Sequence, residues 1–402
     1  MGLFGHDNSN HTCDTPKSFV ADAPEPLVGS VTFHQLNMAI SGGCVAFSTL
    51  SILILIFRHA THFSRPNEQT KILKICTLIP VYSIGSWISI AKPNSYIYIT
   101  PWLEFYQGIA LGSFFLLLCE YVSPSAASRD VFFAALKVTE KKRRGQDSGT
   151  GVDGLEWYRK KWFAVFQYPV IALLVAIATD VTQAANLYCL TSHNAHFAHL
   201  WLKIAIYASI TMAVVAVVTF YVQLKTDLKQ HKPLAKFLAF KPIIGLTFLQ
   251  SILFTILRST NVLKETSKLT WADVNFGIQT MIICVEMVPF SIFFHYAYDV
   301  GAYDLSKPRP LPLAYMGARP SPDSDSETTY APQHMQTNSH SHSHSGEGYY
   351  GGPLGVWAWI TVFNPMDILR AIVFGFSMKA ESRKRRRMGN MSGQEDARMP
   401  AY

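Results

Sequence analysis

The chain has 402 residues, of which 49% are hydrophobic and only 15% are charged, and its formal net charge is +8. Soluble globular proteins usually carry about 25% charged residues, so this composition argues against an ordinary soluble domain. The charges also gather in a few loops and in the C-terminal tail, which leaves long segments almost free of charge. Such a distribution is typical of a protein that crosses a membrane several times.

Seven apolar segments are each long enough for the roughly 20 helical residues that cross a hydrocarbon core. They are residues 36–57, 72–91, 101–122, 163–183, 200–223, 242–262 and 274–297. Helices at the surface of a soluble protein show a polar face, which argues against a soluble core for seven such segments. The first segment follows an acidic tail with prolines, too far into the chain for a cleaved signal peptide. We therefore predict an all-α integral membrane protein with a seven-helix domain over residues 36–298.

Lysine and arginine are distributed unevenly between the two sides of this predicted domain. Four lie in residues 58–74, nine in 123–162, five in 224–241 and eleven after residue 298, all on one side. The other side has four, which are Lys17, Lys92, Lys264 and Lys268. Two more, Lys203 and Arg258, lie inside spans. Because cytosolic loops are enriched in these residues, we expect residues 1–35 in the lumen or outside and the C-terminus in the cytosol.

The predicted outer side carries two features that occur in secretory-pathway proteins. Asn10 begins the N-glycosylation sequon Asn10-His11-Thr12. Cys13 and Cys189 are the only cysteines outside the predicted spans, and both lie on this side. A disulfide between them depends on geometry that the sequence does not define, so their pairing stays open.

Three stretches carry a resemblance to a known family: RHATHFSRPNEQTKILKI (58–75), IPVYSIGSWISI (79–90) and FFLLLCEYV (114–122). Together they resemble organic solute transporter subunit alpha and transmembrane protein 184, over roughly residues 34–300. FNPMDIL (363–369) is similar to the fungal branch of that family. The resemblance implies seven spans with an outer N-terminus. It also implies transport of organic solutes such as steroid conjugates in one branch, and vacuolar or endosomal roles in others. The animal subunit has a cysteine cluster that this chain lacks, so its substrate is not carried over.

Ionisable residues inside a membrane are costly and are candidates for function. Glu104, Asp180 and Arg258 lie near the outer ends of the third, fourth and sixth predicted spans. They would either form an acid–base cluster or reach the interface separately.

Glu286 lies near the middle of the seventh span, with Gln279 seven residues earlier on the same helix face. Gln250, in the sixth span, is a further polar candidate. A central carboxylate suits a proton or cation site. The alternative is a protonated acid that is hydrogen-bonded between helices.

Proline and glycine predict local features of three spans. Pro80, and also Pro289 three residues after Glu286, predict kinks that free backbone carbonyls to line a cavity. For Pro80 the alternative is an ordinary kink in which Ser83 bonds the freed carbonyl. Gly108 and Gly112 form a small-xxx-small pair, which favours close packing between helices.

The C-terminal tail has three predicted parts. Residues 299–352 are rich in proline, serine, histidine and glycine, and we expect them, like residues 389–402, to be disordered. Residues 353–388 predict an amphipathic helix followed by a basic run, in which Asn364 caps a turn that starts at Pro365. This arrangement is typical of an interfacial anchor on an anionic leaflet. Its candidate binding residues are Trp357, Trp359, Arg385, Arg386 and Arg387. An eighth span would place those arginines outside, against the charge distribution.

Several functions of seven-helix proteins are excluded by the motifs. The last span has no lysine for retinal, and CEYVSPS (119–125) and VPFSIFFHYAY (288–298) stand where G-protein-coupled receptors have their signatures. The sequence shows no catalytic triad, paired catalytic carboxylates or zinc-type cysteine spacing. We therefore predict no enzyme activity, no cofactor, no metal site and no nucleic-acid partner.

Two functional interpretations remain. The first is an organic solute transporter in a vacuolar or endosomal membrane. Its expected partners are the lipid bilayer, an organic solute and a partner subunit. The second is a membrane scaffold whose tail recruits a ubiquitin-like autophagy protein. Such proteins bind W-x-x-[LIV], a pattern that the tail offers at Trp357/Ile360 and at Trp359/Val362.

Overall fold

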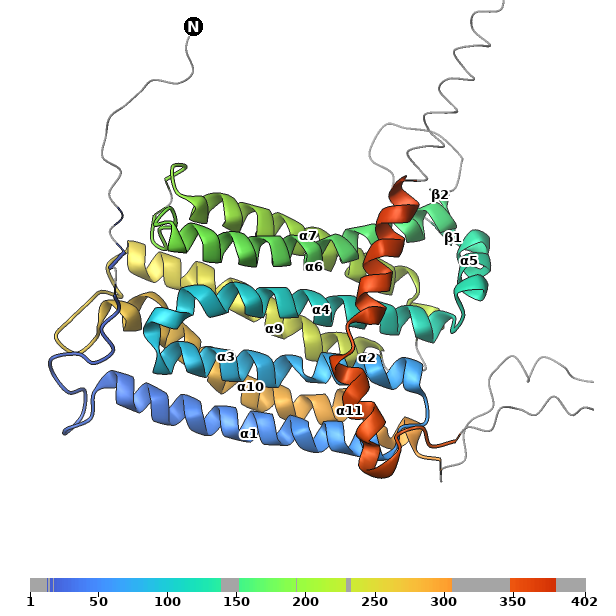
Figure 1. The fold of residues 1–402 in the computed structure, drawn as a ribbon, viewed down its shortest axis with the longest axis horizontal. Helices are drawn as coiled ribbons and strands as arrows, with labels where there is room; N and C mark the ends of the chain where they lie inside the picture. The colour runs from blue at the N-terminus through green and yellow to red at the C-terminus, as the bar shows by residue number, and fades with distance from the viewer. Residues whose placement is uncertain are drawn as a thin grey trace, which may run out of the picture.

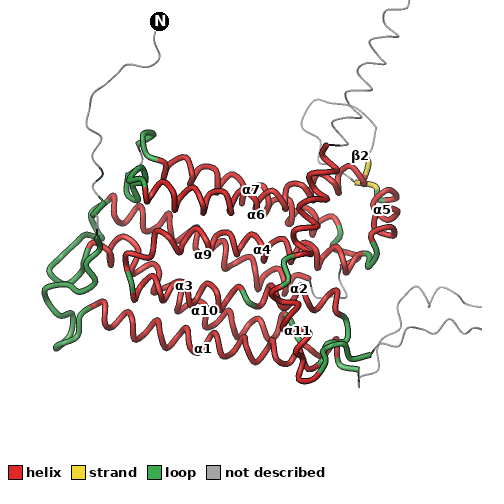
Figure 2. The backbone as a smooth tube through the Cα atoms, viewed as in Figure 1, coloured by secondary structure: helices red, strands yellow, loops and turns green. Residues whose placement is uncertain are grey.

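The computed structural model describes residues 13, 15, 16, 18–138, 152–192, 194–228, 233–305 and 348–380. This part of the chain is helical apart from a two-residue antiparallel pair, β1 (Lys137–Val138) with β2 (Val152–Asp153). The long helices run side by side as one bundle (Figure 1). Figure 2 shows the described loops gathered at the two ends of that bundle.

The bundle helices, in chain order, are α1 (Phe33–Thr61), α2 (Pro66–Cys76), α3 (Leu78–Ala91), α4 (Tyr96–Val122), α6 (Gly154–Ala184), α7 (Ala198–Gln223), α9 (Pro233–Ser259) and α10 (Ile278–Ala297). Shorter elements connect them: η1 (Pro93–Ser95), α5 (Ala126–Ala135), α8 (Lys225–Leu228), the π-helical turn η3 (Asp273–Gly277) and η4 (Val300–Tyr303). The tail contributes η6 (Pro353–Gly355) and α11 (Val356–Phe363). A further tail helix follows at residues 366–380.

Seven helical segments of the described chain are long and apolar enough to cross a membrane: Phe33–Thr61, Pro66–Ala91, Pro93–Val122, Gly154–Ala184, Ala198–Gln223, Asp273–Tyr303 and Pro353–Ala380. The first six contain six of the predicted spans. The remaining predicted span, 242–262, lies largely within α9, a helix of 27 residues. The prediction of an all-α, multi-pass membrane protein is thus confirmed.

The segment Pro353–Ala380 differs in its course from the other six. The sequence predicted an interfacial helix here, although length and composition alone would allow a span. The helix is interrupted at Asn364, whose backbone is extended (φ −78°, ψ 109°). Both halves run across the bundle helices instead of along them (Figure 1). This course is the one expected of a helix that lies in the plane of the membrane.

Local sequence explains where several helices begin and break. Thr32 starts α1 with a capping box, because its side chain and that of Gln35 each accept a hydrogen bond from the other's backbone N–H. α2 begins at Pro66, whose fixed φ suits a first helical turn. Pro80 has no N–H for the carbonyl four residues earlier, and the second span is interrupted nearby at Thr77, between α2 and α3.

The other proline predictions have different outcomes. The hydroxyl of Ser83 lies 3.2 Å from the hydroxyl of Ser48, so it contacts the neighbouring helix α1 and not a carbonyl freed by the kink. α10 continues through Pro289. A proline inside a continuous helix still leaves one backbone carbonyl without its usual donor.

α4 and α6 approach each other closely at two glycines of α4. A Cβ atom added at Gly108 would lie 2.9 Å from the Cα atom of Pro169. One added at Gly112 would lie 3.1 Å from the ring of Phe166. The predicted small-residue pair therefore forms the surface along which these two helices pack.

The N-terminal segment is folded over one end of the bundle. Cys13 and Cys189 form a disulfide with Cα atoms 5.8 Å apart, so the pairing that the sequence left open is present. The backbone N–H of Phe19 donates to Asn94 Oδ1 at 2.7 Å. Its ring stacks on Trp271 with 4.9 Å between centroids. These contacts attach the segment to three separate loops at this end. Asn10 lies outside the described residues.

We expect Gly108→Ala to lower the free energy of unfolding by about 1–3 kcal/mol, because the added methyl group meets backbone that cannot move aside. Gly43→Ala is the matched control, since a Cβ at Gly43 has nothing within 4 Å. A helical alanine there should be neutral or stabilising. Unfolding of both purified variants in mixed detergent measures the difference. Equal stability of the two variants would contradict the packing role of Gly108.

Candidate functional site

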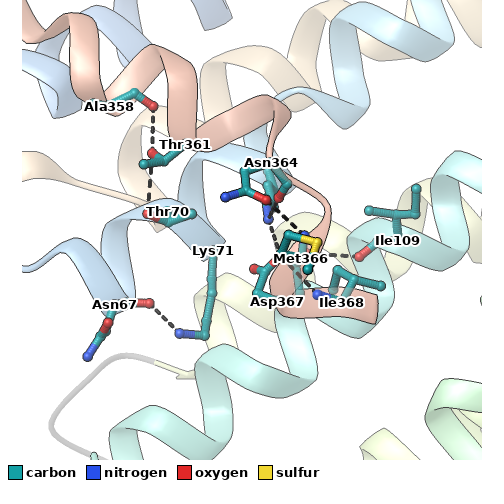
Figure 3. Close-up of polar contacts among 12 residues, drawn as sticks. Asn67, Thr70, Lys71, Ile109, Ala358, Thr361, Asn364, Met366, Asp367 and Ile368 are labelled. Atoms are coloured by element: carbon teal, nitrogen blue, oxygen red, sulfur yellow. Dashed lines mark hydrogen bonds and ion pairs between the residues drawn. The ribbon is translucent and has the colours of Figure 1, made fainter. Parts of the chain in front are cut away.

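The tail is attached to the bundle through one buried lysine. Lys74, in the last turn of α2, has a side chain only 5% exposed. Its ammonium group contacts the carboxylate of Asp367 and donates to the carbonyl of Asn364 at 2.6 Å. Nearby, Thr70 donates to the hydroxyl of Thr361 at 3.4 Å (Figure 3). A charged group of the second span thus binds the tail at the point where the tail changes direction.

The FNPMD sequence makes this change of direction. The side chain of Asn364 accepts a hydrogen bond from the backbone N–H of Met366 at 3.0 Å (Figure 3). Asp367 Oδ1 likewise lies 2.9 Å from the N–H of Ile368. Both acceptors satisfy free N–H groups of the first turn of the helix that follows. Asn364 therefore ends α11 with its backbone and starts the next helix with its side chain, as the sequence predicted for a cap.

Aromatic side chains fix the last part of the tail against α6. The indole N–H of Trp162 donates to the carbonyl of Ala371 at 2.8 Å. Trp162 also packs edge to face against Phe374, at 5.3 Å between ring centroids. Two residues further along the tail, Phe376 packs against Phe163 at 5.5 Å between ring centroids. The tail helix consequently has one face within the protein core.

The opposite face of the tail is apolar and exposed. Trp357 is 60% exposed and Ile360 is 54% exposed. Trp359 packs against the hydrophobic core, and Val362 is only 7% exposed. Of the two W-x-x-[LIV] pairs, Trp357/Ile360 is therefore exposed on the docked tail, whereas Trp359/Val362 is largely buried. Arg385, Arg386 and Arg387 lie outside the described residues.

A pair of polar side chains connects α9 to α10 within the membrane domain. Gln250 Nε2 donates to Glu286 Oε1. The remaining oxygens, Gln250 Oε1 and Glu286 Oε2, are buried and have no hydrogen-bond partner in the described part of the chain. Gln279 lies half-buried two turns away on α10. One contact thus leaves two acceptors without a donor, which is a costly arrangement for buried atoms.

The other ionisable candidates have separate partners. Glu104 on α4 forms an ion pair with Lys203 on α7 at 3.2 Å. Asp180 on α6 accepts from the indole N–H of Trp102 at 2.9 Å. Arg258 on α9 donates to a backbone carbonyl of η3 at 2.9 Å. The structure does not bring Glu104, Asp180 and Arg258 together as one cluster. The basic partner of Glu104 is Lys203. The sequence indicated that Lys203 needs an acidic partner, because it lies inside an apolar segment.

These observations define a polytopic membrane protein with a few polar contacts between apolar helices and a tail bound across them. The model of the family described as organic solute transporter Ostalpha matches residues 37–303. The match covers more than half of the chain, which therefore belongs to this family, a family of transporters. The tail residues 348–380 follow the matched segment. No solved structure matches the chain.

We expect Asp367→Ala to release the tail from the bundle, because it leaves the Lys74 ammonium without its carboxylate. Breaking a buried ion pair usually costs about 3–5 kcal/mol. Because Asp367 is 30% exposed, about 2 kcal/mol is expected here. Hydrogen exchange of amides 356–380 in nanodiscs should accelerate accordingly.

Two further variants test the cause of that release. Lys74→Met combined with Asp367→Leu removes both charges and should restore most of the protection, since an apolar pair replaces a buried ion pair well. Arg370→Ala changes an exposed charge on the same helix and should leave exchange unchanged. Wild-type protection in Asp367→Ala would show that the ion pair does not hold the tail.

Proposed function

We propose that this chain transports an organic solute across a membrane and that the Glu286–Gln250 contact binds the coupling proton. The observation that carries the proposal is a pair of buried oxygens on facing helices that have no donor among the described residues. A single proton on Glu286 Oε2 would donate to Gln250 Oε1. The acid and the amide would then form two hydrogen bonds, and both oxygens would be satisfied.

Protonation at this position would change how strongly α9 is held by α10. The charged form has one hydrogen bond between the two side chains, whereas the protonated form has two. At its other end α9 is packed by Phe237, which stacks on Tyr221 at 5.8 Å. A helix that is packed near one end and held further along by a titratable contact can alternate between two arrangements as the proton binds and leaves. That alternation is what a coupled transporter needs.

The location of the protein remains part of this proposal. The likeness of FNPMDIL to the fungal branch supports a vacuolar or endosomal membrane. We do not propose the scaffold interpretation: Trp359 and Val362 pack against the core, and of the two candidate pairs only Trp357/Ile360 is exposed.

We expect Glu286→Gln to abolish pH-driven uptake while the protein still folds. The second amide can make the same two hydrogen bonds as the protonated acid, so the contact is held in one state. Uptake of a radiolabelled steroid sulfate, used as an organic-anion probe in proteoliposomes with a pH gradient, should fall by about tenfold or more. Glu265→Gln, in the exposed loop after α9, is the control and should transport normally. Normal pH-driven uptake by Glu286→Gln would refute the coupling role.

We also propose that the N-terminal end faces the lumen or exterior and that the tail is cytosolic. The loops at the end with Cys13 and Cys189 carry few lysines and arginines, which supports this orientation. Their disulfide supports it independently, because disulfides persist in oxidising compartments and are rare in the cytosol.

The orientation predicts the outcome of proteolysis on sealed vesicles with the cytosolic side outward. Protease should remove the tail and spare residues 1–35. After detergent is added, the N-terminal segment should be cut as well, because the membrane no longer protects it. Cleavage of the N-terminal segment in sealed vesicles would show that the proposed orientation is reversed.

A further inference from the structure

A groove of about 680 Å³ lies on the side of the bundle between α6 and α7. Its walls include Ala164 on α6, and Met212 and Val215 on α7. Lys160 and Lys161 on α6 also line it. Met212 is 47% exposed and Val215 is 53% exposed, so these walls face away from the protein core. In a protein that spans a membrane, such a surface faces the lipid.

The floor of the groove is fixed by a polar contact between the two helices. Ser209 Oγ donates to Gln167 Oε1 at 2.7 Å, and Gln167 Nε2 donates to the carbonyl of Ser209 at 2.9 Å. Gln167 and Ser209 are both buried. Because α6 and α7 run in opposite directions, this contact sets which residues lie level with each other. Lys160 and Lys161 lie about two turns from it, toward the end of the bundle with α5 and β1 (Figure 1).

Positive charge is concentrated at the lysine end of the groove. Lys160 lies 3.2 Å from Glu156, but their side chains are 60% and 46% exposed, and exposed pairs of this kind are weak. An ammonium group has three N–H donors, so this pair leaves donors for another acceptor. Lys161 is the second basic side chain of the lining, and its ammonium group lies 5.7 Å from the centre of the Trp157 ring. Among the described residues, two lysines and no acidic residue line the groove, which favours an anionic headgroup.

The length of the groove matches one leaflet of a bilayer. On α7 the lining runs from Tyr207 to Ala216, which is about 14 Å of helix at 1.5 Å per residue. A hydrocarbon core is roughly 30 Å thick, so one leaflet contributes about half of that. An acyl chain can therefore lie along the apolar walls while its headgroup stays at the membrane surface beside the lysines.

We infer that this groove binds an anionic phospholipid, with an acyl chain along α7 and the phosphate held by Lys160 and Lys161. The ligand comes from the leaflet at this end of the bundle, where the tail also lies. The site does not involve Glu286 or Gln250. The lipid-binding inference can therefore be tested independently of the proposed transport.

The test measures which lipid stays bound to the purified full-length protein. Wild-type protein is equilibrated with vesicles of equal phosphatidylserine and phosphatidylcholine, extracted in mild detergent and examined by native mass spectrometry. It should retain phosphatidylserine in preference to phosphatidylcholine. Lys160→Ala combined with Lys161→Ala should lower the retained phosphatidylserine roughly thirtyfold, given about 1 kcal/mol for each lysine near an anionic headgroup.

Two further variants separate the headgroup from the chain. Ala208→Trp fills the groove without changing its charge and should reduce the retention of both lipids. Arg58→Ala combined with Lys225→Ala removes two exposed charges at the same end of the bundle, outside the groove, and should retain phosphatidylserine as the wild type does. Thermal unfolding of each variant checks that it is folded.

Three results would overturn the inference. The first is equal retention of the two lipids by the wild type. The second is unchanged phosphatidylserine in the variant lacking Lys160 and Lys161. The third is an equal loss in the Arg58 and Lys225 control, which would indicate a general effect of charge at the membrane surface and not a site.

Discussion

The absence of water in the hydrocarbon core is the constraint on which this structure depends, because every polar group there must find its partner within the protein. The ion pair of Glu104 with Lys203 and the reciprocal hydrogen bonds of Gln167 with Ser209 meet that requirement, and each joins two helices. The Glu286–Gln250 contact meets it only partly, since one oxygen of each group has no donor among the residues that the structure describes. A proton on Glu286 would supply the missing hydrogen bond.

Much of the fold could be predicted from the sequence because its main determinants are local. A run of about 20 apolar residues predicts a span whatever lies elsewhere in the chain. Gly108 and Gly112, spaced by one helical turn, likewise predicted a packing surface before its partner was known. The course of residues 353–380 was also inferred, because a basic run follows them. Length and composition alone do not distinguish this helix from a span.

The partners of the polar residues could not be predicted, because they depend on contacts between distant parts of the chain. Lys74 and Asp367 are separated by 293 positions, and nothing near Lys74 indicates that its partner lies in the tail. The expected cluster of Glu104, Asp180 and Arg258 rested on equal depth in the membrane. Depth does not define which helix faces are adjacent, and the fold places Lys203 beside Glu104 instead.

The contact between Lys74 and the tail also means that the second span obtains its full set of partners only from residues near the C-terminal end. Synthesis proceeds from the N-terminus, so α2 is made long before Asn364 and Asp367 exist. Until then a lysine that is nearly fully buried in the finished protein has neither its carboxylate nor its carbonyl partner. A chain that stops before the tail can insert every helix of the bundle and still carry this unpaired ammonium group. The second span therefore reaches its final set of contacts only after residues 290 positions and more further along the chain have been made.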